Sequence, residues 1–176
     1  MDDAVPPRMS RAGDRESGLA RDDKLELRLW LRLLTCTHLI EGRVRARLRE
    51  RFATTLARFD LLAQLDRVPD GLGMGELSSR LMVSNGNVTG LAQRLIEEGL
   101  VARLPAADDR RRARLPLTAA GKRAFDAMTP DHERWIDGLF TGLTRAEMIQ
   151  FLDLLARLKR SIHADPAPGN SGRRAS

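Results

Sequence analysis

The chain has 176 residues, and its 30 Lys and Arg outnumber its 24 Asp and Glu to give a formal net charge of +6. That length suits one hydrophobic core with a small added subdomain, and the positive charge favours a polyanionic partner. A single cysteine, Cys36, excludes an intramolecular disulfide and a Cys-rich metal site, and the lack of a bilayer-length apolar run or a signal segment predicts a cytoplasmic protein without a membrane partner.

Both ends of the chain are polar and aperiodic, so residues 1–22 and 165–176 are predicted to be disordered. Asp22 or Asp23 can cap a first helix that runs to about Glu50. Its apolar residues recur at three- and four-residue spacing, at Leu25, Leu29, Leu33, Cys36, Ile40 and Val44. More apolar residues flank this stripe, at Leu27, Trp30, Leu31 and Leu34. A helix this apolar on several faces predicts a homodimer contact.

The next segment has the order of a helix-turn-helix. Thr55 is placed to cap a helix over Leu56–Asp66 with Leu61, Leu62 and Leu65 inward, and Val68-Pro69-Asp70-Gly71 ends it. Leu72-Gly73-Met74 is compatible with a short edge strand. We expect a helix over Glu76–Leu81 with Leu77 and Leu81 buried, then a turn over Met82-Val83-Ser84.

Ser84 is predicted to cap a recognition helix that reaches about Glu98 and ends at Gly99 in the left-handed conformation. Helical spacing directs Val88, Leu91, Leu95 and Ile96 to the core. The residues left facing outward are Asn85, Asn87, Thr89, Gly90 and Arg94.

A basic hairpin follows, with predicted strands over Leu100–Leu104 and Ala113–Leu117. Pro116 implies that the second strand lies at an edge or ends early. From Arg80 to Arg123 nine basic residues face four acidic ones, so most of the net positive charge lies in this segment. This distribution favours DNA as the partner, although a merely solvated basic surface is the alternative interpretation.

Helices close the chain. Thr118-Ala119-Ala120-Gly121 opens one that runs to Met128, Pro130 interrupts it, and His132–Leu143 is helical again. Thr144 and Glu147 form a capping box for a last helix. Its apolar stripe consists of Met148, Phe151, Leu152, Leu155 and Leu158.

The predicted fold is mainly α with a small β-wing. A winged helix-turn-helix DNA-binding lobe covers 55–118, and a helical dimerisation region combines 23–54 with 119–164. The three histidines are too widely spaced for a metal site, and no catalytic motif is present. We therefore expect neither an enzyme nor a bound cofactor.

The outward residues suit DNA. Asn85 or Asn87 can specify an A·T pair by bonding adenine N6 and N7, although capping or a phosphate contact is the alternative. Ser84, Thr89 and Arg94 are better placed for phosphates. Gly86 and Gly90 cost the helix roughly 1 kcal/mol each relative to Ala, and their expected benefit is close approach to DNA.

The ordered motifs closely resemble the MarR family of regulators over roughly residues 24–163. The matching stretches are Arg58–Leu65, Gly75–Leu81, Ser84 through Thr89, Arg94–Val101, Asp109-Arg110-Arg111 and Leu117–Gly121. The resemblance implies a homodimer that binds a palindromic operator, mostly as a repressor, and that leaves DNA on binding a small aromatic effector. It also sends Arg111 into the minor groove, where a guanidinium is attracted by negative potential. Asp109 then holds this Arg or braces the hairpin, while Arg110, Arg112 and Arg114 add phosphate contacts.

A narrower likeness concerns regulators that respond to hydroxycinnamoyl-CoA thioesters, and Leu25–Thr37 and Asn85–Leu91 carry it. Arginines alternate along the first helix on either side of the apolar stripe Val44, Leu48 and Phe52; these are Arg43, Arg45, Arg47, Arg49 and Arg51. Guanidinium groups suit the phosphates of an aromatic acyl-CoA, although arginines that snorkel on a surface helix explain the pattern equally well. Other candidate effector contacts are Trp30, His38, Phe59 and Asp60. The alternative for Trp30 is burial in the dimer core. The alternative for His38 is a structural role.

Two further hypotheses concern regulation. Cys36 would allow a redox-controlled regulator, but a thiol within an apolar stripe is normally inert. An architectural DNA-binding protein without an effector is the other alternative, and it would bind unrelated DNA nearly as well as an operator.

Overall fold

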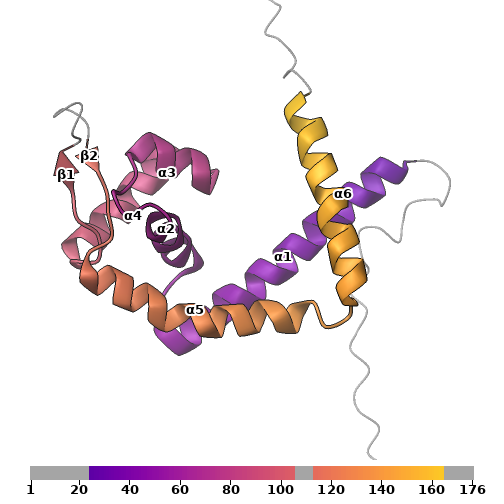
Figure 1. The fold of residues 1–176 in the computed structure, drawn as a ribbon, viewed down its shortest axis with the longest axis horizontal. Coiled ribbons are helices and arrows are strands. Elements are labelled where there is room, and N and C mark those ends of the chain that lie inside the picture. The colour runs from indigo at the N-terminus through magenta and orange to yellow at the C-terminus, as the bar shows by residue number, and fades with distance from the viewer. Residues whose placement is uncertain (1–23, 106–112, 165–176) are drawn as a thin grey trace, which may run out of the picture. The chain divides into compact units, whose positions relative to one another are not determined.

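The computed structural model describes residues 24–105 and 113–164 (Figure 1). Its elements in chain order are α1 (Leu25–Phe52), α2 (Leu56–Asp66), α3 (Met74–Leu81), α4 (Asn85–Glu97), β1 (Leu104–Pro105), β2 (Ala113–Arg114), α5 (Ala119–Leu139) and α6 (Arg145–Ala164). The predicted class, mainly helical with a small antiparallel wing, is confirmed.

The chain forms two compact units that divide between Glu133 and Arg134. This division does not coincide with the predicted boundaries at 54/55 and 118/119, which stay predictions. The predicted disordered ends, 1–22 and 165–176, lie outside the described residues.

Leucines from α2, α3 and α4 build the core of the first unit. Leu61 and Leu65 of α2, Leu77 of α3 and Leu95 of α4 are almost fully buried. The three helices pack on one another and carry the hairpin at their side (Figure 1). Thr55 caps α2 as predicted, because its hydroxyl accepts a hydrogen bond from the Arg58 amide at 3.3 Å.

Helix α1 differs from its prediction at both ends. Lys24, in a left-handed conformation and without a side-chain cap, precedes Leu25, so the predicted cap at Asp22 or Asp23 is wrong. The helix continues two residues past Glu50 to Phe52. Val44 and Leu48 are buried, whereas the apolar residues in the N-terminal half of α1 are exposed or half-exposed.

Helix α3 begins at Met74, two residues earlier than predicted, because the Glu76 carboxylate accepts from the Gly73 amide at 2.8 Å and so caps the helix start. Leu72, predicted within a short strand, forms an isolated antiparallel bridge with Leu115. Leu77 is buried as expected, but Leu81 is only half-buried.

The hairpin strands are shorter than predicted. Leu104 pairs with Arg114 and Pro105 with Ala113, while Val101 and Leu117 meet in an isolated bridge. Pro116, which has no amide hydrogen, offers its carbonyl to the Ala102 amide at 3.0 Å, and the second strand ends before it. The hairpin base is therefore paired on both sides of this proline.

Pro130 does not interrupt the helix, so the predicted break there is wrong: α5 runs unbroken from Ala119 to Leu139 and contains Pro130. The residues around the proline are held by tertiary contacts. Met128 and Asp131 are buried, Arg51 pairs with Asp131, and the His132 ring stacks on Phe59. Packing of this face offsets the hydrogen bond that proline removes.

Helix α6 lies in the second unit, and the Thr144 capping box predicted for it is confirmed. The Thr144 amide donates to Glu147 at 2.8 Å, and the Glu147 amide donates to the Thr144 hydroxyl at 3.3 Å. No residue of α6 is buried, and its exposed apolar side chains include Ile149, Leu152 and Ile162. Throughout the described ranges, none of the helices is both long and apolar enough to cross a membrane.

Candidate nucleic-acid interface

Helices α3 and α4 form a helix-turn-helix whose turn is fixed by hydrogen bonds. Met82 ends α3 in the left-handed conformation, at φ 53°. The Val83 amide donates to the Ser78 carbonyl at 3.3 Å, and the Ser78 hydroxyl donates to the Val83 carbonyl at 2.8 Å. Two opposed bonds between the same residues hold the angle between the helices.

Ser84 precedes α4 as predicted, but its side chain makes no capping hydrogen bond. The predicted side-chain cap by Ser84 is therefore wrong. Its hydroxyl is exposed and can bond to a partner outside the chain. At the other end Gly99 has φ 73°, the left-handed conformation expected after the helix.

The inward face of α4 consists of Val88, Ala92 and Leu95, with Leu91 and Ile96 half-buried. Ala92 was missed because alanine adds little to an apolar pattern. The predicted outward residues are all exposed: Asn85, Asn87, Thr89, Gly90 and Arg94.

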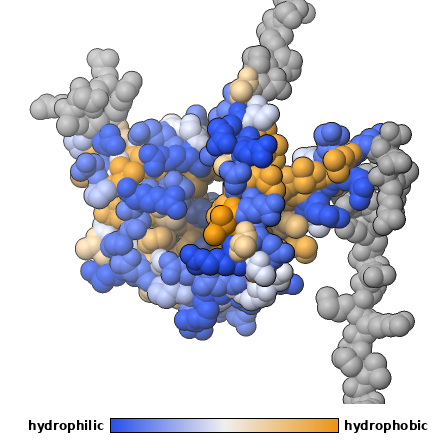
Figure 2. Space-filling view, turned by 45° about the vertical axis from the view of Figure 1, so that its right-hand side comes forward, coloured by the Kyte–Doolittle hydropathy of each residue, from blue (hydrophilic) through white to orange (hydrophobic). Residues whose placement is uncertain are grey.

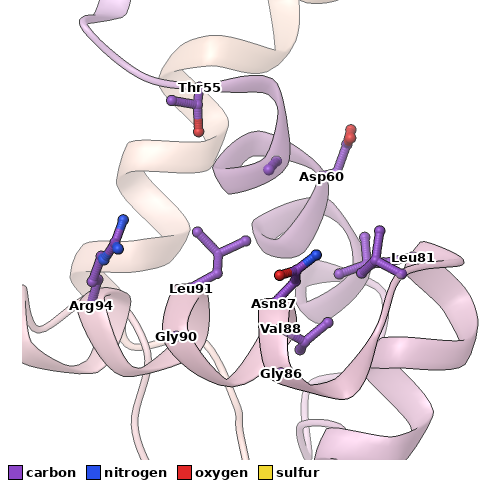
Figure 3. Close-up of a pocket in the computed structure, with 11 residues that line it drawn as sticks. Thr55, Asp60, Leu81, Gly86, Asn87, Val88, Gly90, Leu91 and Arg94 are labelled. Carbon is purple, nitrogen blue, oxygen red and sulfur yellow. The ribbon is translucent and has the colours of Figure 1, made fainter.

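These outward residues occupy different flanks of α4, because successive residues turn by about 100°. Asn87 and Arg94 lie on the same flank as Leu91, and all three point toward α2 (Figure 3). Asn85 lies on the opposite flank, where its carbonyl accepts from the Thr89 hydroxyl at 2.8 Å. The two asparagines therefore face different directions.

Between the two flanks lies a ridge of exposed residues, of which Gly90 was in the outward set predicted from the sequence and Gln93 and Glu97 were not. It contains Gly86 and Gly90, then Gln93 and Glu97, all exposed. Gln93 donates its amide to Glu97 at 3.0 Å. Helical spacing alone would have found Gln93 and Glu97. A Cβ atom at Gly86 or Gly90 would meet nothing within 4 Å, so no contact within the described chain requires glycine there.

A hollow of about 570 Å³ opens between the start of α2 and the flank of α4 (Figure 3). Its lining comprises Thr55, Ala57, Asp60, Leu81, Val83, Gly86, Asn87, Val88, Gly90, Leu91 and Arg94. Burial raises the pKa of Asp60 above its ordinary value, and the nearby Glu41 carboxylate raises it further. The hollow thus combines apolar side chains with one cationic side chain and one carboxyl group whose pKa is raised.

An ion pair ties the two walls of this region together. Arg58 of α2 donates from Nη1 to Glu98, just after α4, at 2.6 Å, and its Nη2 pairs with the same carboxylate. The hydrogen bond from Arg58 lowers the pKa of Glu98, and the same bond raises the pKa of Arg58. This bidentate contact fixes the N-terminal part of α2 relative to the C-terminal end of the recognition helix.

The predicted wing contacts at Asp109, Arg110, Arg111 and Arg112 lie outside the described residues. Arg114 is described, and its half-exposed side chain turns back onto the protein backbone. Its guanidinium donates to the carbonyls of Asp70 and Gly71.

The candidate effector residues are not brought together at one place. Asp60 lines the hollow, but the neighbouring Phe59 is buried and stacks on His132 with ring centroids 4.4 Å apart. On α1, Trp30 and Arg43 are both exposed and about 20 Å apart at 1.5 Å per residue. The other candidates on this helix, His38, Arg45 and Arg47, are also exposed.

Two α1 residues that the sequence places among apolar neighbours, Cys36 and Trp30, are exposed in the structure. Cys36 is exposed, although it belongs to the apolar stripe expected along this helix. Trp30 is 56% exposed. In Figure 2 the orange surface marks residues of high hydropathy that are exposed on the described part of the chain. Across the described ranges, no group of three or more His, Cys, Asp or Glu could hold a metal ion.

Known proteins with the same pattern are transcription regulators. A model of the MarR family matches residues 54–112, which contain α2, α3, α4 and β1. The chain is 34% identical over 113 residues to the transcriptional activatory protein BadR of Rhodopseudomonas palustris, a match over 62% of this chain and 64% of BadR. The chain thus spans a little under two thirds of that relative. It is 29% identical to the transcriptional repressor MdtR of Bacillus subtilis, over 66% of this chain and 74% of MdtR.

The crystal structure of a MarR family transcriptional regulator from Silicibacter pomeroyi is similar to most of this chain. The sequences are 35% identical, the TM-score is 0.67, and the match covers 82% of this chain and 99% of the other. This similarity and the helix-turn-helix with its exposed recognition face lead to one conclusion: the chain belongs to the MarR family of DNA-binding transcriptional regulators.

Proposed function

We propose that this regulator is a homodimeric repressor that binds a palindromic operator and leaves it when a small aromatic effector binds. The observation that carries the proposal is the overlap between the hollow and the recognition helix. Asn87, Gly90 and Arg94 line the hollow and also belong to the outward set expected to contact DNA. A ligand in the hollow would therefore compete with DNA for the same side chains.

The homodimer is supported by apolar side chains that a single chain leaves exposed. On α1, Leu25, Leu29 and Leu39 are each more than half exposed, and on α6 the same holds for Leu152 and Ile162. Exposed apolar residues repeated along a helix indicate a protein partner. A second copy of the chain suits a palindromic operator, since two equal half-sites need two equal lobes.

We propose repression because a ligand that occupies part of the DNA-contacting face would remove the protein from DNA. Release from DNA then switches the promoter on if the bound protein is a repressor. The relatives do not share one direction of control, since the name of BadR says activatory and that of MdtR says repressor. Transcription from the regulated promoter with and without the protein decides between the two.

The hollow suits an aromatic acid. Leu81, Val83 and Leu91 offer apolar contacts, and Arg94 offers a guanidinium for a carboxylate. A hydroxycinnamoyl-CoA thioester would need a separate place for its phosphates, and the exposed arginines of α1, among them Arg43 and Arg45, are the candidates. One of these, Arg45, pairs with Glu41 at 3.8 Å and would exchange that partner for phosphate.

The test is operator binding by fluorescence anisotropy, with DNA from upstream of the regulator's own gene. Coumarate and coumaroyl-CoA are titrated separately against the complex. We expect Asp60→Asn to bind DNA like the wild type but to respond differently to the acid. Arg43→Gln combined with Arg45→Gln should weaken only the response to the thioester. Specific binding that neither compound changes would overturn the choice of effector.

Two controls address the alternatives. Cys36→Ala should respond to the effector like the wild type, whereas a loss of regulation by peroxide in this variant would favour redox control. Binding to unrelated DNA that is as tight as binding to the operator would favour an architectural protein.

A further inference from the structure

Arg114 ends β2, and its side chain turns back onto the loop between α2 and α3. Nε donates to the carbonyls of Asp70 and Gly71, both at 3.2 Å, and Nη2 donates to Gly71 at 2.6 Å. The residue is only half-exposed. The sequence predicted that Arg114 binds a DNA phosphate, but in the structure its guanidinium already contacts the protein backbone.

Backbone contacts at the same place strengthen this connection. The Leu115 amide donates to the Leu72 carbonyl at 2.9 Å, and the Leu72 amide donates back to Leu115 at 3.4 Å. Gly71 has φ 76°, and a Cβ atom there would collide with the backbone of Leu115 and Pro116. The loop at Gly71 and the backbone that follows β2 therefore lie so close together that only glycine fits at position 71. We call this contact between residues 70–72 and 114–116 the wing junction.

The wing junction links the hairpin to the start of the helix-turn-helix, since α3 begins two residues after Leu72. A planar guanidinium with two donors on two carbonyls fixes direction as well as distance. A lysine ammonium would supply the same charge but not the same fixed geometry. The direction in which β2 leaves the lobe thus depends on the guanidinium of Arg114.

We propose that Arg114 is a positioning residue for DNA binding: it orients the hairpin relative to the helix-turn-helix and does not itself contact DNA. The inference rests on the proposed role of the hairpin in operator binding. It assigns to Arg114 a function different from that expected of Arg110, Arg111 and Arg112, whose charge would act on DNA directly.

The test compares Arg114→Lys with Arg103→Lys, because Arg103 is an exposed arginine of the same hairpin. Both changes keep the net charge. Amide hydrogen exchange of the free protein should become faster at Leu72 and Leu115 in Arg114→Lys and stay unchanged in Arg103→Lys. Operator affinity should fall roughly tenfold in Arg114→Lys only, the size expected for the loss of one good DNA contact. Circular dichroism establishes that both variants are folded equally.

A double-mutant cycle with Arg111→Ala separates positioning from direct contact. If Arg114 acts through the hairpin, the two losses of affinity are not additive, because a misdirected hairpin has already lost its contacts. Additive losses, or Arg114→Lys with unchanged exchange and unchanged affinity, would overturn the inference. If Arg111→Ala alone has no effect, the proposed minor-groove contact fails. Faster exchange with weaker binding in Arg114→Lys would then still support positioning, and faster exchange with full affinity would refute it.

Discussion

The rings of Phe59 and His132 stack with their centroids 4.4 Å apart and their planes at 28°. Phe125 lies on the same phenylalanine, with centroids 5.4 Å apart. This cluster joins α2 to α5 within the first unit and places an ionisable ring beside buried apolar side chains.

The free energy of unfolding should depend on pH through His132. Burial lowers the pKa of His132 below its ordinary value, and the Glu133 carboxylate opposes that effect only in part. The unfolded chain therefore takes up a proton near pH 6.5 before the folded chain does, so stability is full above this pH and falls as the pH drops toward the folded pKa. Urea unfolding at pH 7.5 and 5.5 measures the difference.

His132→Phe is the matched variant for this measurement, because it keeps a stacked ring and removes the proton. It should lose less stability than the wild type between the two pH values. An equal loss in both proteins would show that other groups, such as the buried carboxyl groups, cause the pH dependence.

Gly90→Ala should increase stability and weaken DNA binding. Alanine favours an exposed helix by roughly 0.5–1 kcal/mol over glycine, and nothing within 4 Å of Gly90 would obstruct the methyl group. The lost affinity follows if DNA approaches α4 closely at this point. Thermal unfolding and operator anisotropy measure the two effects.

Gly42→Ala is the control for that variant. Gly42 lies in α1 and also has nothing within 4 Å of a Cβ position. Gly42→Ala should raise the free energy of unfolding by a similar amount and leave operator affinity unchanged. Full DNA affinity in Gly90→Ala would contradict the close approach of DNA at this glycine.

Gly121→Ala should destabilise the fold strongly. A Cβ atom at Gly121 would collide with the Leu100 carbonyl oxygen, which already accepts from the Thr118 amide at 3.0 Å and the Thr118 hydroxyl at 3.2 Å. Backbone on both sides of the clash cannot move cheaply, so we expect a loss of about 1–3 kcal/mol, the usual range for overpacking. Urea unfolding measures it, and a wild-type midpoint would contradict the tight contact between α5 and the hairpin base.

Asn85→Ala and Asn87→Ala should have different consequences, because the two side chains lie on different flanks of α4. An asparagine bonded to adenine contributes about 1–3 kcal/mol and specifies one base pair. Loss of it should weaken binding to the operator and relax the preference at that position. Competition with single-base operator variants identifies which asparagine has this role.

Asn87→Ala should in addition alter the response to the effector, since Asn87 lines the hollow and Asn85 does not. Equal effector responses in the two variants would show that the ligand binds elsewhere.

The sequence by itself determined the features that depend on neighbours along the chain. Local patterns sufficed to predict the helix caps, because a cap acts through hydrogen bonds or backbone conformation within a few residues. These caps are Thr55 before α2, Thr144 with Glu147 at α6, and Gly99 after α4. The outward face of α4 followed from the helical period for the same reason. Ser84 shows the limit of this argument: its position was correct and its hydrogen bond was not.

Tertiary structure decided the features that depend on residues far apart in the chain. Contacts of Asp131 and His132 with α1 and α2 keep α5 continuous through Pro130. Carbonyls more than 40 residues away accept hydrogen bonds from Arg114 and make its side chain part of the wing junction. The hollow likewise needs α2 and α4 side by side. No pattern along the chain encodes these distances, because they arise only when packed helices bring separate segments together.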